Sequence, residues 1–90
     1  MSEVLTAPQL RDTAAELLND ANRLEQSAAD LGTALRHVAD AWGGPGQRRM
    51  EEELSTERRE LYEAAREIRA AADRAVARAE ELEAAVVLDA

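Results

Sequence analysis

The residues with the most reactive side chains in this sequence are one histidine, His37, and two groups of glutamates. Residues 51–53 are all glutamate, and so are three of the four residues 80–83. Clustered carboxylates serve as metal ligands or acid–base pairs when other ligand types lie beside them. A di-iron helical bundle needs inward-facing Glu-x-x-His pairs, and the sequence has none. We therefore expect a solvated surface here, and we predict no enzyme activity, catalytic residue, metal ligand or cofactor.

A glycine-rich segment and two arginine doublets are the remaining candidates for ligand binding. Residues 43–46, Gly-Gly-Pro-Gly, are not followed by Gly-Lys-Ser/Thr, which argues against a phosphate-binding loop. Arg48-Arg49 and Arg58-Arg59 lie near residues 51–53, and ion pairing along a helix explains them better than phosphate binding. The formal net charge of −8 disfavours nucleic acids and anionic membranes as partners.

The composition indicates one small all-α domain. Charged residues make up 33% of the 90 residues, and the hydrophobic share of 46% is dominated by alanine and leucine. Trp42 and Tyr62 are the only aromatic residues, so there is little material for a thick globular core. This composition is typical of long packed helices. Cysteine is absent, which excludes disulfides and thiolate metal sites.

The first half of the chain has the pattern of one long amphipathic helix, which we predict over residues 7–41. Thr6 and Gln9 fit a capping box, in which the Thr6 hydroxyl accepts from the Gln9 N–H and the Gln9 side chain reaches back. Apolar residues then recur in alternating steps of four and three, which is a heptad pattern. One edge of this pattern is Leu10, Leu17, Leu24, Leu31 and Val38. The other edge is Ala14, Ala21, Ala28, Leu35 and Trp42.

The second half predicts a matching helix over residues 47–88, after a turn at residues 42–46. Its apolar stripe is Leu54, Leu61, Ala65, Ile68, Ala72, Ala75, Ala79, Leu82 and Val86. Glu57 and Arg58 interrupt the stripe, so this part is expected to be hydrated or to face polar groups. The apolar residues 86–88 are expected to close the open end of a bundle.

Two helices of this length can bury only one stripe against each other, so a second hairpin is expected to complete the core. A chain of this size with an alanine-rich core is marginally stable alone, and a four-helix bundle buries the remaining leucines. We predict an antiparallel helical hairpin that forms a dimer. The predicted core and dimer-interface residues are Leu10, Leu17, Leu24, Leu31, Leu35, Val38, Leu54, Leu61, Ile68 and Leu82.

The tripeptide Trp42-Gly43-Gly44 occupies the only strong break between the two heptad patterns. In this setting the chain resembles, over essentially its whole length, the WXG family of early-secreted-antigen-like substrates of type VII secretion. The resemblance implies a hairpin that pairs with itself or with a related WXG-type chain. It also implies export by a membrane-embedded ATPase, as a substrate or as the partner of a larger secreted toxin, with Trp42 and Gly44 in the turn half of the export signal.

The other half of the export signal in that family is Tyr-x-x-x-Asp/Glu after the second helix. Here the only tyrosine, Tyr62, lies within the predicted second helix and is followed four residues on by Arg66. The resemblance therefore implies that another chain supplies the tail signal. Residues 1–5 show no basic segment before an apolar run, so we expect no Sec-type signal peptide, and we expect no membrane insertion. The expected location is outside the cell, after synthesis in the cytoplasm.

Three other functions fit the same residues. The first is a cytosolic coiled-coil adaptor or chaperone that holds one helical partner. The second is an acidic immunity-type binder, whose charge complements a basic target. The third, a helical arm that contacts tRNA, is the least compatible with the acidic charge.

Overall fold

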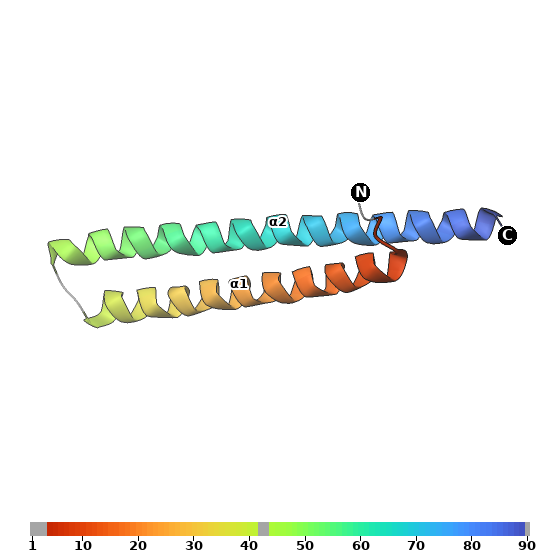
Figure 1. Cartoon of the computed structure of the whole chain (residues 1–90). Helices are drawn as coiled ribbons and strands as arrows, with labels where there is room; N and C mark the ends of the chain where they lie inside the picture. The colour runs from red at the N-terminus through yellow and green to blue at the C-terminus, as the bar shows by residue number, and fades with distance from the viewer. Residues whose placement is uncertain (1–3, 42–43, 90) are drawn as a thin grey trace.

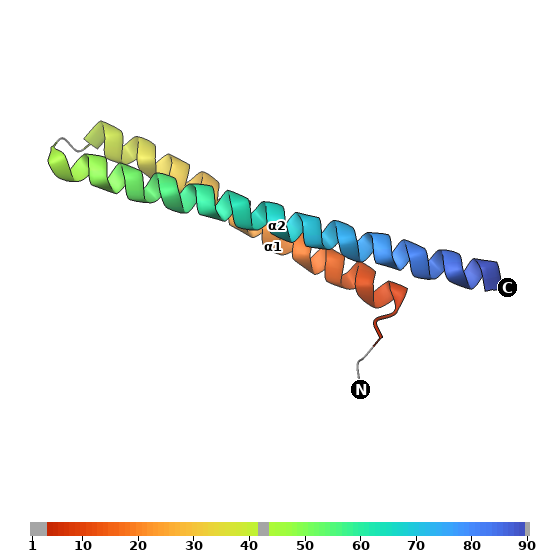
Figure 2. The same ribbon diagram turned by 90° about the horizontal axis from the view of Figure 1, so that it is seen from above.

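The computed structural model describes residues 4–41 and 44–89 and contains two helices, α1 (Ala7–Ala41) and α2 (Pro45–Asp89). The helices lie side by side and antiparallel, and the described part of the chain contains no strand (Figures 1 and 2). The molecule is a rod with extents of 70 × 23 × 16 Å. The predicted all-α antiparallel hairpin is confirmed.

The N-terminus of α1 is closed by the predicted capping box. The Gln9 N–H donates to Thr6 Oγ1 at 3.3 Å, and the Thr6 N–H donates to Gln9 Oε1 at 2.9 Å. Two N–H groups that the helix itself cannot satisfy are thereby paired. The Leu10 N–H donates to the Thr6 carbonyl at 2.9 Å, which is the first helical hydrogen bond.

Removal of this cap is expected to lower stability by a modest, measurable amount. Thr6→Ala leaves the Gln9 N–H without its partner, so the free energy of unfolding should fall by about 1 kcal/mol. Thr6→Ser is the matched control, because it keeps the accepting oxygen. Urea denaturation followed by circular dichroism compares the two. Equal midpoints for the two variants would show that the cap contributes nothing.

The bend between the helices is built on Gly44 and Pro45. Gly44 has φ = 131°, a conformation that side chains with a Cβ rarely adopt. Its carbonyl accepts from the Gln47 N–H at 3.1 Å, so α2 begins at Pro45 and not near Gln47 as expected. Proline suits the first helical position, because that position needs no N–H donor. Gly46 lies in the first turn of α2 and needs no special backbone freedom.

The core of the hairpin is a double row of alanines. All six buried apolar side chains among the described residues are alanines spaced by seven, each 0–2% exposed: Ala14, Ala21, Ala28, Ala65, Ala72 and Ala79. Ion pairs between the helices place Arg11 level with Glu83 and Glu25 level with Arg69. In this register the alanines of α1 lie level with those of α2. Small side chains at the contact let the two helix axes approach closely.

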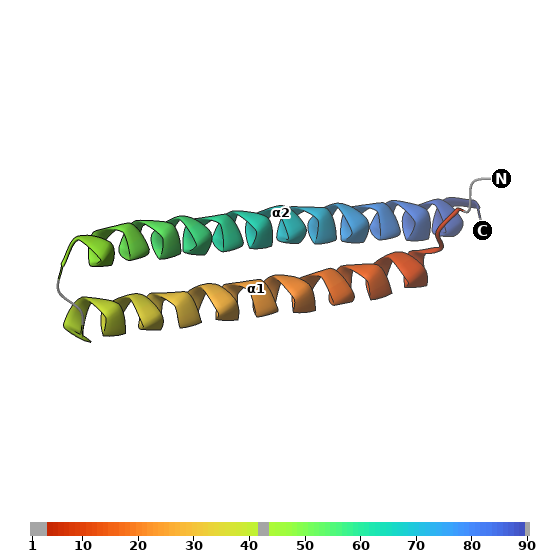
Figure 3. The same cartoon turned by 60° about the vertical axis from the view of Figure 1, so that its left-hand side comes forward.

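The alanine rows do not continue to the bend. In the same register Leu35 lies level with Arg58, and the ribbons diverge toward the bend (Figures 1 and 3). The Arg58 side chain lies over Gly32, where an added Cβ would be 3.4 Å from Arg58 Nη1. Arg58 interrupts the apolar stripe of α2, and the Arg58 side chain occupies the space between the helices there by packing on Gly32 of α1.

At the other end α2 extends beyond the start of α1 (Figure 1). Val86, Val87 and Leu88 are 71%, 74% and 84% exposed. Within the single hairpin these residues cover nothing. Their predicted role at the open end of a bundle stays a prediction that depends on a second hairpin.

Candidate partner-binding face

Most of the large apolar side chains of the hairpin lie in two rows, which are only partly buried. On α1 the row is Leu10, Leu17, Leu24, Leu31 and Val38, and on α2 it is Leu54, Leu61, Ile68, Ala75 and Leu82. None of these ten reaches the burial of the alanines beside them. A leucine that is half exposed retains a large part of its hydrophobic driving force for burial.

Helix geometry places both rows on one side of the hairpin. Successive residues of a helix are rotated by about 100° around its axis. A residue three positions after a buried alanine, or four positions before it, therefore lies on one side of that alanine. A residue four positions after it, or three positions before it, lies on the other side. Leu17 belongs to the first class on α1, and Ile68 belongs to it on α2. The ion-paired Glu25 and Arg69 belong to the second class and meet across the helices. Both leucine rows therefore lie on the side opposite these ion pairs, and we call it the leucine face.

Small residues widen the leucine face at its edges. Ala34 on α1 and Ala64 and Ala71 on α2 are next to the leucine rows and partly exposed, as is Met50 near the bend. The result is an apolar strip along the length of the hairpin with few charges at its centre. A long, partly exposed apolar strip of this kind is typical of surfaces that bind other proteins.

The predicted interface residues mostly come together on this face. Leu35 is the exception, because it continues the row of buried alanines toward the bend and is partly exposed. Of the predicted turn motif, Gly44 has the positive φ of the bend, and Trp42 and Gly43 lie outside the described residues. In the sequence, the three residues of the motif fill the interval between α1 and α2.

The opposite side of the hairpin is polar and holds the ion pairs between helices. Arg11 donates to Glu83 Oε1 through Nε at 2.9 Å and Nη2 at 2.7 Å. Arg69 pairs with Glu25 and also donates to Asn22 Oδ1 at 2.7 Å. These side chains are about half exposed, so each pair adds little stability. The pairs mark the register of the two helices, and the packing of the buried alanines is what holds it.

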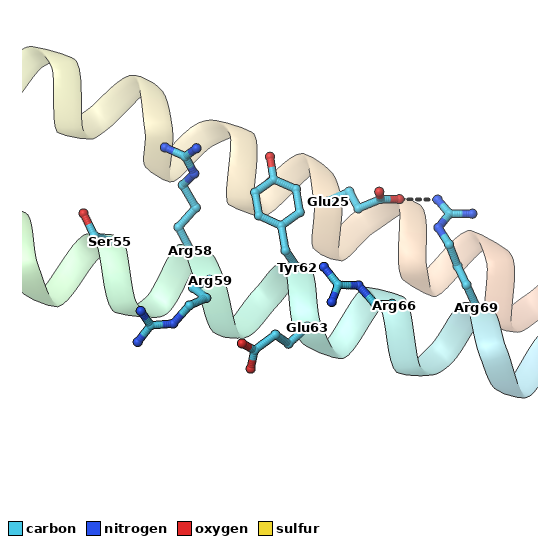
Figure 4. Close-up of a pocket in the computed structure, with 8 residues that line it drawn as sticks. All are labelled: Glu25, Ser55, Arg58, Arg59, Tyr62, Glu63, Arg66 and Arg69. Atoms are coloured by element: carbon cyan, nitrogen blue, oxygen red, sulfur yellow. Dashed lines mark hydrogen bonds and ion pairs between the residues drawn. The ribbon is translucent and has the colours of Figure 1, made fainter.

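An open groove of about 690 Å³ lies on this polar side, next to the Glu25–Arg69 pair. Figure 4 shows Arg58 and Tyr62 reaching from α2 toward α1, with Arg66 beside them. The guanidinium carbon of Arg58 is 5.9 Å from the centre of the Tyr62 ring, which is a cation–π contact. The sequence prediction that the doublets at 48–49 and 58–59 pair with nearby glutamates is wrong, since no ion pair among the described residues involves them.

The other candidates for chemistry are His37 and the two groups of glutamates. His37 is exposed, and Glu81 and Glu83 pair with arginines. The described residues contain no group of three or more metal-ligating side chains placed to hold an ion. Neither α1 nor the described length of α2 has an apolar stretch sufficient to cross a bilayer.

Comparison with protein-family models, curated protein sequences and solved structures finds no match for this chain. The leucine face and the Trp-x-Gly bend are therefore the features from which a function is proposed.

Proposed function

We propose that this chain is a small type VII secretion substrate, or the partner exported with one, and that it acts by pairing its leucine face with a second hairpin. The partner is a second copy or a related chain with its own Trp-x-Gly turn. Pairing two such faces forms a four-helix bundle and buries both leucine rows. A role in protein–protein binding rather than catalysis agrees with the described reactive side chains, which form no group placed to hold a metal ion.

The observation that carries this proposal is a hairpin with one unpaired apolar face and Trp42-Gly43-Gly44 at its bend. The helices end and begin on either side of this tripeptide, at Ala41 and Pro45. In the family that the chain resembles, this turn forms half of the export signal, so we expect export to depend on Trp42. Tyr62 lies well inside α2, and Arg66 follows it one turn later. These positions favour a partner chain that carries the tail half of the signal.

The proposal is tested by export from a bacterium with an active type VII machine. The chain and its co-purifying partner should appear in the culture medium, and Trp42→Ala should reduce export to background while the purified dimer persists. Gly46→Ala is the matched control near the bend, because Gly46 lies in the first turn of α2, where alanine favours the helix more than glycine does; its export should be normal. Recovery of the wild-type chain from the cytosol alone would overturn the proposal and favour the adaptor.

A further inference from the structure

The groove on the polar side holds arginines that the hairpin does not neutralise. Within the described residues, ion pairs engage Arg11, Arg23, Arg69 and Arg78. Arg58, Arg59 and Arg66 line the groove, and no described carboxylate lies within 4.0 Å of their guanidinium groups. The lining also includes two carboxylates, Glu25 (paired with Arg69) and Glu63, so four arginines against two glutamates leave the groove with a formal charge of +2. In a chain with a net charge of −8, this local excess of positive charge favours a ligand with a small number of carboxylates.

The groove is also held in place by packing. Arg58 lies between Gly32 of α1 and the ring of Tyr62, so its side chain is less free than an ordinary surface arginine. Arg69 is held at the other end by Glu25 and Asn22. Tyr62 is 38% exposed, and it presents an aromatic surface between Arg58 and Arg66. A partly ordered cation loses less entropy when it binds a carboxylate.

We propose that this groove docks a short, extended, acidic segment of a partner protein. Arg58 and Arg66 are separated by about 12 Å along the helix axis. Two residues four apart in an extended strand are separated by about 13 Å and point the same way. Carboxylates at such positions meet Arg58 and Arg66, and the apolar side chain midway between them lies on Tyr62. The recognised pattern is acidic-x-apolar-x-acidic.

The charge distribution favours a short peptide over a long polyanion. Glu57, Glu60 and Glu67 are exposed on the same helix and surround the arginines with negative charge. A nucleic acid or an anionic membrane would extend past the groove onto this acidic surface and be repelled. The stretch of α2 that lines the groove is about 20 Å long, which an extended segment of about six residues covers.

The groove and the leucine face lie on opposite sides of the hairpin, so the two can be occupied at once. A dimer that pairs through leucines leaves two copies of the groove open. Docking of the acidic segment is therefore separate from the proposed secretion function, and either can fail without the other.

The test uses the full chain and a fluorescein-labelled probe peptide, Gly-Glu-Ser-Leu-Ser-Glu-Gly, at a low salt concentration of about 20 mM, where screening is weak. Fluorescence anisotropy gives Kd, and amide chemical shifts map the site. We expect Arg58→Gln and Arg66→Gln each to weaken binding about threefold to fivefold. Arg74→Gln is the matched control, because it removes the same charge from an exposed position of α2 outside the groove; its Kd should be unchanged.

Several results would overturn the proposal. The wild-type chain could fail to bind the probe, or bind equally a probe with both glutamates replaced by glutamine. The three variants could bind alike, which would mean a nonspecific charge effect. An oligothymidylate of equal charge, vesicles with anionic lipid or inorganic phosphate could displace the probe at lower concentration, which would assign the groove to another ligand. Arg66 takes part in none of the hydrogen bonds or ion pairs between the helices among the described residues, so Arg66→Gln tests the groove even if Arg58→Gln unfolds the chain.

Discussion

Leu17→Glu is expected to prevent pairing of the hairpins, whereas Leu18→Glu, one residue further along, is expected to leave pairing intact. Leu17 lies in the partly buried row of the leucine face. Leu18 is 37% exposed and lies on the polar side of α1. The two variants have the same composition, net charge and helix propensity, so they differ only in the face that carries the new carboxylate.

The expected loss of affinity at Leu17 is large because a symmetric dimer contains the change twice. Each copy loses the burial of the remaining leucine surface, about 1 kcal/mol. Each also places a carboxylate in an apolar contact, which costs more than the lost burial unless the chains separate. A total of at least about 3 kcal/mol corresponds to a fall in affinity of about a hundredfold or more.

Sedimentation equilibrium at micromolar concentrations measures this difference. The wild-type chain and Leu18→Glu should sediment as dimers, and Leu17→Glu should sediment as a monomer with reduced helical content. Equal dimerisation of the two variants would show that pairing uses another surface. A wild-type chain that is monomeric and fully folded would contradict the predicted dependence on a second hairpin.

The sequence was sufficient to predict the features of this fold that depend on local or periodic information. The capping box at Thr6 and Gln9 needs only four adjacent residues, and its hydrogen bonds form as expected. The heptad pattern predicted two helices, because a repeat of 3.5 residues keeps one stripe facing a partner helix. The predicted first residue of α2 differs from the observed one by two positions: the helix begins at Pro45 and not at Gln47.

The features that depend on how the two helices meet could not be predicted from either helix alone. The division of each apolar stripe into buried alanines and partly exposed leucines follows from the rotation of the helices, which the ion pairs between them reveal. Spacing along a single helix predicts that Arg58 pairs with glutamates of the same helix. In the fold it packs on Gly32, a residue whose significance appears only when α1 and α2 are side by side.

Ala72→Leu is expected to destabilise the hairpin strongly, although it adds hydrophobic surface and favours a helix as well as most residues do. Ala72 is 0% exposed and lies level with Ala21, which is also 0% exposed. A leucine there has no space between the two backbones, so the helices must separate or the side chain must adopt a strained rotamer. Overpacking of this kind costs about 1–3 kcal/mol, a large part of the roughly 5–13 kcal/mol that stabilises a domain of this length.

Ala77→Leu is the matched control, since Ala77 is exposed on the same helix. Its free energy of unfolding should stay within about 0.5 kcal/mol of the wild type, while the melting temperature of Ala72→Leu should fall by about 5–15 °C. Both variants are compared at one protein concentration, because the proposed dimerisation would make the apparent stability depend on concentration. If Ala72→Leu were as stable as Ala77→Leu, the two helices would not be held at the separation that alanine permits, and the leucine rows would be free to close on each other without a partner.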